Sequence, residues 1–226
     1  MKKAFTLAEV LITLGIIGVV AAITIPGLIQ NCVKKRTVAQ LKESYSIVQQ
    51  AIRLSEEENG EAEGWDTTLS GHNFFHKYLA NYVKWQKEYT TTELNKQAPR
   101  KHLDGSPYAG TFYTNNITSH FSLLNGAMIS VQVETNGLFI GIDVNGPSKP
   151  NRMGVDTFFF FFSNKYGLVP NGAVGTPAQY NYGTYKRSNV KGTGNQYACN
   201  KSKKGYWCAA LIMQDGWQIS SDYPWF

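Results

Sequence analysis

The stretch that decides the fold is residues 5–29, FTLAEVLITLGIIGVVAAITIPGLI. Glu9 is its only ionisable side chain, and the stretch exceeds the roughly 20 apolar residues that a membrane-spanning helix needs. A carboxylate deep in such a helix costs about 3 kcal/mol, so acids at that depth are usually paired or functional. The stretch therefore predicts a membrane-spanning helix in which Glu9 either has a partner or lies shallow enough to reach the lipid headgroups.

The helix is expected to continue beyond residue 29, because apolar side chains in 30–54 recur at spacings of three and four. These are Val38, Leu41, Tyr45, Val48 and Ile52. Such spacing places them on one face of a helix. The two segments predict a single helix of roughly 50 residues, apolar all round in its first half and amphipathic in its second. Pro26 and Gly27 are expected to kink or loosen it, and residues 56–60 to end it.

The remainder of the chain changes from helical to strand patterns. Residues 72–89 predict a second helix, whereas 127–133 and 138–144 alternate as the two strands of a hairpin do. The five consecutive phenylalanines in 156–163 predict a strand buried on both faces. Residues 206–214 fit a short helix or a strand. The order of elements predicts an α+β fold, with the long N-terminal helix packed on an antiparallel sheet.

Composition favours an aromatic, β-rich globular part over a charged helical bundle. Charged residues make up 17% of the 226 residues and aromatic residues 13%. The net charge of +6 falls to +4 without Lys2 and Lys3. The basic clusters are short, so we expect them to be solvated faces and do not expect nucleic acid as a partner. They lie at 34–36, 100–101 and 201–204.

Two of the three cysteines, Cys199 and Cys208, lie nine residues apart across a polar loop. In an oxidising compartment this spacing favours a disulfide that closes a small loop, whereas in the cytosol both would stay as unlinked thiols. The N-terminal stretch indicates export, so we expect the disulfide. Cys32 stands alone, and no second Cys or His pair accompanies the two C-terminal cysteines as a zinc site requires.

The sequence contains no motif of an enzyme active site. It has no HExxH, no Gly-x-Ser-x-Gly elbow and no Walker A loop. His72 and His76 stand at i and i+4, a spacing that suits a metal pair, but no third ligand is evident. Two such histidines are more often packing and surface residues. We therefore expect a protein without catalytic residues.

One loop gathers oxygen atoms between two expected strands. It contains Asp143, Asn145 and Asp156, together with glycines and prolines. Carboxylate and amide oxygens are the ligands that Ca²⁺ takes, so a structural calcium site is one interpretation. The loop is not an EF-hand, since its glycine is misplaced and no closing Glu follows. The alternative is a tight turn held by hydrogen bonds from Asp side chains to the backbone.

The N-terminus resembles that of type IV prepilins and type II secretion pseudopilins. The residues that carry the resemblance are Lys2-Lys3-Ala4, Phe5-Thr6-Leu7, Glu9, the apolar stretch 15–22 and Ile25-Pro26. The resemblance implies that a prepilin peptidase cuts between Ala4 and Phe5 and methylates the new N-terminus. It also implies an inner-membrane subunit, with its C-terminal domain outside the cytoplasm, that a platform protein and its ATPase add to a filament. The family usually has Gly before the cut, so Ala4 leaves the rate of cleavage open.

In such a filament the resemblance implies that Glu9 pairs with the N-terminal amine of a neighbouring subunit or with its own. Phe5 and the apolar run would bury against the helices of other pilin subunits, and Pro26 would permit local unwinding. The expected organisation is a leader at 1–4, a membrane and filament-core half-helix at 5–29, an amphipathic half at 30–55 and a globular α+β domain at 56–226.

Two other functions stay open at this point. An ordinary signal peptidase would cut after Ala21 and release a secreted binding domain, although Glu9 and the unbroken amphipathic helix argue against it. A minor competence pilin would contact DNA through the basic clusters. The sequence does not indicate which machine a pilin-like subunit would serve.

Overall fold

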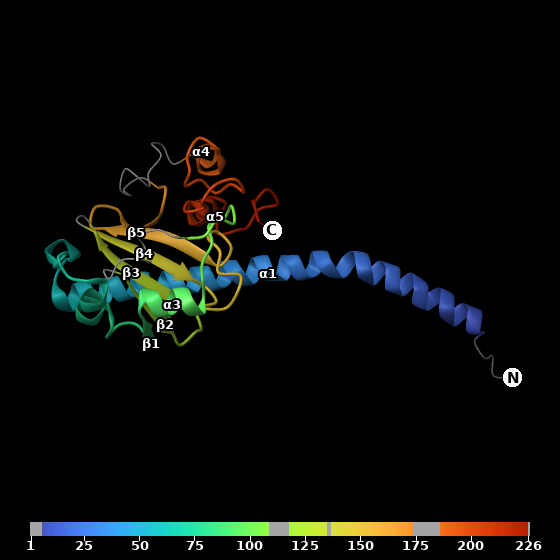
Figure 1. The fold of residues 1–226 in the computed structure, drawn as a ribbon, viewed down its shortest axis with the longest axis horizontal. Coiled ribbons are helices and arrows are strands. Elements are labelled where there is room, and N and C mark those ends of the chain that lie inside the picture. Colours follow the sequence, from blue (N-terminus) through green and yellow to red (C-terminus); the bar gives the residue numbers. More distant parts are fainter. Residues whose placement is uncertain (1–5, 109–117, 135–136, 174–185, 226) are drawn as a thin grey trace.

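The protein has one long helix that projects from a globular domain (Figure 1). The computed structural model describes residues 6–108, 118–134, 137–173 and 186–225. The long helix, α1 (Leu7–Asn59), has 53 residues and runs without interruption from the projecting part into the domain. The prediction of a single long helix is thereby confirmed, and so is the α+β, pilin-like fold class.

Local chemistry defines both ends of α1. At its start the Thr6 hydroxyl accepts a hydrogen bond from the Glu9 N–H, and the Glu9 carboxylate accepts one from the Thr6 N–H, which makes a reciprocal capping box. At its end Gly60 has a φ of 80°, a conformation that glycine adopts without strain. The helix therefore ends within the stretch predicted to end it.

Pro26 lies inside α1 and does not break it. Proline lacks the N–H that would bond to the carbonyl of Ala22, so the helix loses one of its hydrogen bonds there. Figure 1 shows the helix straight beside the domain and curved in its blue N-terminal part. A proline is one of the few established causes of bending in a helix.

The second half of α1 packs on the sheet through one face. Its buried residues recur at short spacings: Thr37, Leu41, Ser44, Val48, Ala51, Ile52 and Ser55. Three members of the predicted face are buried, whereas Val38 and Tyr45 are half-buried at the edge of the core. The predicted face did not include Ser44 and Ala51, because the prediction rested on the spacing of large apolar residues. Their small side chains are buried because they let the helix backbone approach the sheet.

The domain is built on one six-stranded sheet, an antiparallel meander in which each strand pairs with the next. Its strands are β1 (Trp85–Tyr89), β2 (Thr118–Leu123), β3 (Met128–Glu134), β4 (Gly137–Asp143), β5 (Thr157–Ser163) and β6 (Gly167–Pro170). The predicted hairpin and the phenylalanine strand are confirmed as β3, β4 and β5, with Ile140 opposite Val131 on one side and Phe160 on the other. Strands β1, β2 and β6 are absent from the prediction.

Strand β5 fills both faces of the sheet, because successive residues of a strand point to opposite sides. Phe160 meets Tyr45 of α1 with the ring centroids 5.3 Å apart, and the Tyr45 hydroxyl donates to the Leu168 carbonyl at 2.8 Å. On the other side Phe159 stacks on Tyr206 at 5.1 Å. The phenylalanine run is therefore buried between α1 and the C-terminal segment.

The helix predicted at 72–89 is wrong in its second half. The structure has a short helix, α2 (Gly71–Phe74), then a π-helical turn, η2 (Phe75–Leu79), and then strand β1. Pairing with β2 satisfies the backbone of β1 and overrides the local helical pattern. The other helical segments are η1 (Ala62–Gly64), α3 (Thr91–Gln97), α4 (Arg187–Lys191) and α5 (Cys208–Gln214).

Candidate assembly interface

The first half of α1 projects from the domain (Figure 1). Its apolar side chains are uncovered. Their exposed fractions run from 44% at Val10 to 80% at Leu7. The large exposed hydrophobic residues here are Leu7, Val10, Leu11, Ile12, Leu14, Ile16, Ile17, Val19, Val20, Ile23, Ile25, Leu28 and Ile29. Within the described ranges α1 is the one helix long and apolar enough to cross a membrane. An apolar surface of this extent indicates an interface with lipid or with protein.

Threonine hydroxyls in this half are satisfied by the helix itself. Thr13 Oγ1 lies 3.0 Å from the Glu9 carbonyl and 2.9 Å from the Val10 carbonyl, to which it donates. Thr24 Oγ1 donates to the Val20 carbonyl at 2.9 Å. Such bonding back to the preceding turn removes the need for an outside partner. The two threonines therefore do not lessen the fit of this segment to an apolar environment.

Glu9 differs, because only part of its carboxylate is used. Oε2 accepts hydrogen bonds from the N–H and the hydroxyl of Thr6, both at 2.9 Å. Among the residues that the structure describes, none donates a hydrogen bond to Oε1. The predicted processing residues Ala4 and Phe5 lie outside the described residues. Glu9 thus keeps, near the start of the helix, a carboxylate oxygen that the described chain does not use.

A basic belt, defined as Lys34, Lys35 and Arg36, follows the apolar half. It lies immediately before Thr37, where burial against the domain begins. Beside the belt a groove of about 450 Å³ separates α1 from the loop that follows α5. Its lining residues are Asn31, Lys34, Lys35, Val38, Ala39, Trp217, Gln218 and Ile219. The basic belt therefore lies between the exposed apolar half of α1 and the half of α1 that packs on the domain.

The predicted oxygen-rich loop contains a buried ion pair. Arg100 Nη2 donates to Asp143 Oδ2 at 2.9 Å, and the two side chains are only 1% and 2% exposed. Burial raises the pKa of Asp143 to about 7, while the charge of Arg100 acts in the opposite direction. Burial also raises the pKa of Asp156, against hydrogen bonds from backbone N–H groups. The buried guanidinium therefore bonds to Asp143, and its positive charge also favours the ionised form of Asp156.

The carboxylates of the predicted calcium site are already occupied. The two oxygens of Asp156 accept the N–H groups of Asn151 and Arg152 at 2.6 and 2.7 Å. Asp143 accepts a guanidinium, and the Asn145 side-chain amide donates to a backbone carbonyl. Ca²⁺ needs six to eight oxygen ligands, and a cation already lies on the site. These bonds are of the kind that the tight-turn alternative expects, whereas within the described residues the buried side-chain oxygens of Asn145 and Asn151 accept no hydrogen bond. Calcium binding stays a prediction.

A disulfide joins Cys199 to Cys208, with their Cα atoms 4.7 Å apart. Both cysteines are buried, and Cys208 is the first residue of α5. The bond ties the loop that carries the 201–204 lysines to α5, which packs on β5 and β6. Cys32 is exposed on α1 as a free thiol.

A cluster that the sequence reasoning did not assemble lies at the β1 edge of the sheet. His72 Nδ1 is 2.8 Å from Oε1 of Glu88, and His76 Nε2 is 3.3 Å from Oε2. A continuous helix through 72–89 would place Glu88 about 24 Å along its axis from His72, so no third ligand was expected. Strand β1 turns the chain back and brings Glu88 to both histidines.

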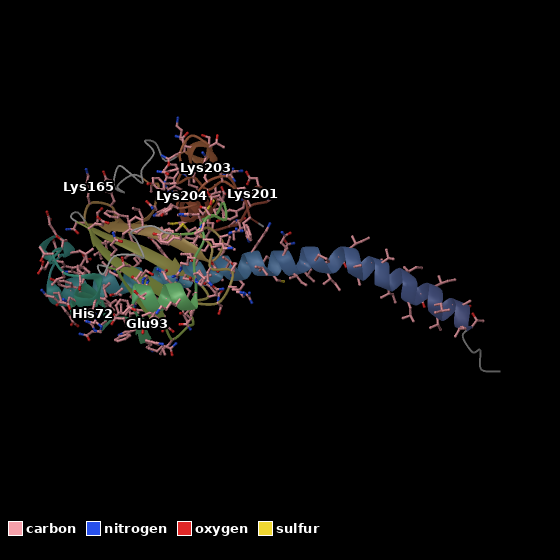
Figure 2. The ribbon with its side chains drawn as sticks, in the orientation of Figure 1. His72, Glu93, Lys165, Lys201, Lys203 and Lys204 are labelled. Atoms are coloured by element: carbon pink, nitrogen blue, oxygen red, sulfur yellow. A yellow bond between two sulfur atoms is a disulfide. The ribbon has the colours of Figure 1, made fainter. Side chains whose placement is uncertain are left out.

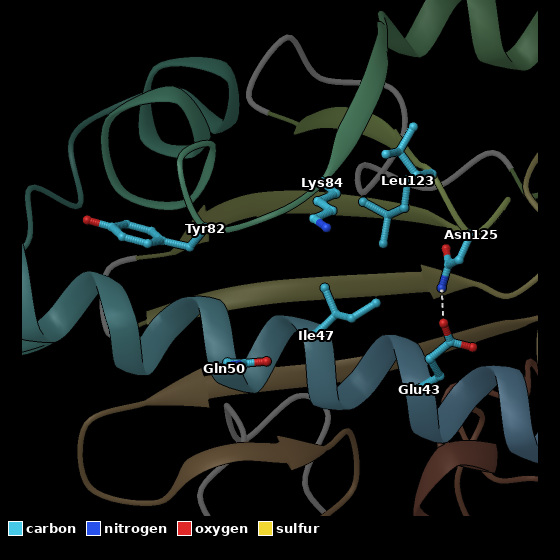
Figure 3. Close-up of a pocket in the computed structure, with 8 residues that line it drawn as sticks. Glu43, Ile47, Gln50, Tyr82, Lys84, Leu123 and Asn125 are labelled. Carbon is cyan, nitrogen blue, oxygen red and sulfur yellow. Dashed lines mark hydrogen bonds between the residues drawn. The ribbon is translucent and has the colours of Figure 1, made fainter.

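A second hollow lies between α1 and the sheet edge (Figure 3). It encloses about 320 Å³ and is lined by Glu43, Ile47, Gln50, Tyr82, Lys84, Leu123, Leu124 and Asn125. Figure 3 shows Asn125 reaching α1, where its Nδ2 donates to Glu43 Oε1 at 3.1 Å. The hollow thus has both apolar and polar side chains in its walls, and one hydrogen bond crosses it from Asn125 to α1.

Two family models match the chain. A prokaryotic N-terminal methylation motif matches residues 1–25 and is typical of type IV pilins and pseudopilins. A family of unknown function, DUF6613, matches residues 27–225. Neither a curated protein nor a solved structure matches. The resemblance of the N-terminus to type IV prepilins and pseudopilins is thereby confirmed.

Proposed function

This chain belongs to the DUF6613 family and begins with a pilin-type methylation motif, and from that premise we propose that it is a structural subunit of a type IV pilus-like filament or a type II secretion pseudopilus. The observation that carries the proposal is the uncovered apolar half of α1, most of which lies within the motif. The domain buries its own core against the other half of the same helix. The projecting half is therefore the surface that the subunit offers to other molecules.

The proposed subunit passes through lipid before it reaches a filament. A prepilin peptidase cuts between Ala4 and Phe5 and methylates the new amine. The first half of α1 then anchors the subunit in the inner membrane, with the domain outside the cytoplasm. A platform protein and its ATPase move it into a filament, where Phe5 and the apolar side chains exchange lipid contacts for contacts with other pilin helices. Pro26, which already lacks one helical hydrogen bond, lets the helix adjust during this transfer.

Glu9 supplies attraction and axial register in this proposal. Cleavage before Phe5 creates a cationic amine four residues from Glu9. An unpaired carboxylate is costly in the low-dielectric core of a filament, so pairing with the amine of a neighbouring subunit is favoured. The Thr6 bonds leave Oε1 for that amine while they hold the side chain at the start of the helix.

The test compares two substitutions in the native host. Glu9→Val removes the carboxylate, and Thr13→Val, the matched control, removes a polar group one turn later that bonds only to its own helix. We expect both proteins in the membrane at parental levels. We expect Glu9→Val alone to reduce the fraction recovered in sheared, pelleted filaments by tenfold or more. Filaments at parental levels with Glu9→Val would show that assembly does not depend on pairing between Glu9 and the N-terminal amine.

Intact mass of the membrane protein tests the processing step separately. A mature chain that starts at Phe5 with one added methyl group is the expected result. A chain that starts at Ala22 would show release by an ordinary signal peptidase, and the domain would then be a secreted soluble protein.

A further inference from the structure

The cluster of His72, His76 and Glu88 is used neither by the methylation motif nor by the proposed assembly. One ligand atom from each residue lies within 4.8 Å of the other two. Glu88 contacts His72 Nδ1 through both carboxylate oxygens, at 2.8 and 2.9 Å, and His76 Nε2 through Oε2 at 3.3 Å. Figure 2 shows His72 at the lower edge of the domain, on the side of Glu93 and away from the labelled lysines of the C-terminal loop.

Three consecutive elements place the ligands. Ser70 caps α2, which carries His72 in its first turn. The chain then widens into the π-helical turn η2, which carries His76, and such turns are frequent at functional sites. Glu88 comes from β1, where it pairs with Phe121 of β2. The sheet register therefore sets the distance between Glu88 and the histidines.

Aromatic packing orients His76 before any ligand binds. Its ring meets Trp85 edge-on at 5.3 Å, Phe75 at 5.8 Å and Phe121 at 6.0 Å. The two histidine rings lie 4.5 Å apart. A side chain that packing already holds loses little conformational entropy when it binds. The His72, His76 and Glu88 side chains are 53%, 37% and 26% exposed, so an ion reaches them directly from solvent.

No Lys or Arg side chain within the described ranges forms an ion pair with Glu88, whose ion-pair partners are the two histidines. The neighbouring Lys77 and Lys87 lie over the rings of Tyr78 and Tyr89, at 4.9 and 4.3 Å from the centroids. The Arg100 guanidinium, by contrast, already occupies the carboxylate of the oxygen-rich loop. Glu88 on β1 therefore has no Lys or Arg ion-pair partner among the described residues, in contrast to Asp143, which Arg100 neutralises.

We propose that His72, His76 and Glu88 bind a divalent transition metal ion of the zinc class. Two imidazole nitrogens and one carboxylate form a known zinc ligand set, in which water or another donor takes the fourth position. Ligand distances of about 2.1 Å in a tetrahedron place ligand atoms about 3.4 Å apart, which small side-chain rotations reach from the present separations. Nitrogen ligands disfavour Ca²⁺ and Mg²⁺.

Binding would link the α2–η2 segment to the exposed edge strand of the sheet. It would fix β1, the first strand in the order of the described sheet, to the α2–η2 segment, whose helix α2 contacts β2 and β3. Because the ion binds the folded arrangement of these elements, it stabilises the domain, and the stabilisation grows with the logarithm of the ion concentration above the dissociation constant.

The test uses the full-length protein in detergent with Cys32→Ser, because Cys32 is a free thiol and thiolates bind zinc on their own. The protein is stripped with a chelator, dialysed and titrated with ZnCl₂ by calorimetry. We expect one Zn²⁺ per chain and a melting temperature that rises with zinc concentration. Absence of binding at millimolar ZnCl₂ would overturn the proposal.

Substitutions then assign the ligands. His72→Ala, His76→Ala and Glu88→Gln are each expected to weaken zinc binding by about tenfold or more. Glu63→Gln, which removes an exposed carboxylate from η1, is the matched control and should bind as the parent does. Melting without zinc checks that each variant is folded. Parental zinc affinity in a His72→Ala and His76→Ala double variant would also overturn the proposal, whatever the outcome for filament assembly.

Discussion

The two halves of α1 differ in the source of their partners. In the second half Leu41 and Val48 are 0% and 2% exposed, because the domain covers them. In the first half Leu11 and Ile16 are 61% and 59% exposed, although their side chains are equally apolar. One continuous helix thus contains a segment that its own chain completes and a segment that only another molecule completes.

The acidic residues of the two regions show the same difference. Asp143 meets the Arg100 guanidinium inside the fold, whereas Glu9, among the residues that the structure describes, has only the Thr6 groups at its own helix end. The domain is therefore self-contained, and the projecting half is not. Substitutions in the two regions should affect different properties, namely the stability of the domain and the assembly of the subunit.

The largest effect is expected from Arg100→Met, which leaves Asp143 and Asp156 buried without their cation. Removing one partner of a buried ion pair costs about 3–5 kcal/mol of unfolding free energy. Urea unfolding of the full-length protein in detergent, followed by near-UV circular dichroism at pH 7.5, measures it. Arg53→Met on the exposed face of α1 is the matched control, with a change within about 0.5 kcal/mol. Equal losses of unfolding free energy in Arg100→Met and Arg53→Met would show that the buried ion pair contributes no more to stability than an exposed arginine does.

A pair of leucine substitutions tests the two halves of α1 directly. Leu41→Ala should lower the unfolding free energy of the domain by about 3 kcal/mol, because it leaves a cavity against the sheet. Leu11→Ala should leave the domain unchanged and should reduce the amount of filament recovered from cells. The same urea titration and a filament pelleting assay measure the two effects. A destabilised domain in Leu11→Ala would mean that the projecting half is part of the folding unit.

A pH dependence of stability is the third expected effect, and Asp143 brings it to the domain. Its pKa rises from an ordinary 3.8 to about 7 on folding, so between these values the folded chain holds a proton that the unfolded chain has lost. Raising the pH through this window therefore lowers stability. Relative to Asp143→Asn, the native protein should lose melting temperature progressively as the pH rises from 4 to 7.

His102 acts in the opposite direction, because burial lowers its pKa to about 4. Its folded form resists protonation, so it stabilises the domain above its ordinary pKa and loses that contribution as the pH falls toward 4. The native protein and the Asp143→Asn variant both contain His102. Its contribution therefore cancels when the melting temperature of one is subtracted from that of the other. A difference that stays constant across the window would show that Asp143 is already ionised in the folded protein at low pH.

Strands were predictable where apolar residues repeat and not where polar residues are buried. β3, β4 and β5 are rich in Ile, Val and Phe, whereas β2 is buried at every position although it reads TSHFSL. Its polar groups find partners across the sheet: His120 Nδ1 lies 2.7 Å from Ser130 Oγ, and Thr118 Oγ1 donates to Gln132 Oε1 at 3.1 Å. A pattern of hydrophobicity cannot show such pairs, because each half looks exposed on its own.

The site residues divide in the same way. The apolar half-helix, its methylation motif and Glu9 were recognisable because each is local and continuous in the sequence. The partner of Asp143 was not, since Arg100 lies 43 residues earlier in the chain. Glu88 was missed for a related reason: the helical pattern of 72–89 hid the strand that returns it to His72.

The sequence by itself determined the long helix, its apolar first half and the requirement for an outside partner. Helical hydrogen bonds are local, and transfer to lipid depends on composition alone. Only the tertiary structure decided which charges meet, namely Arg100 with Asp143 and Glu88 with two histidines. Those contacts join distant residues, and their distances depend on strand register and helix packing, which no single segment of the chain contains.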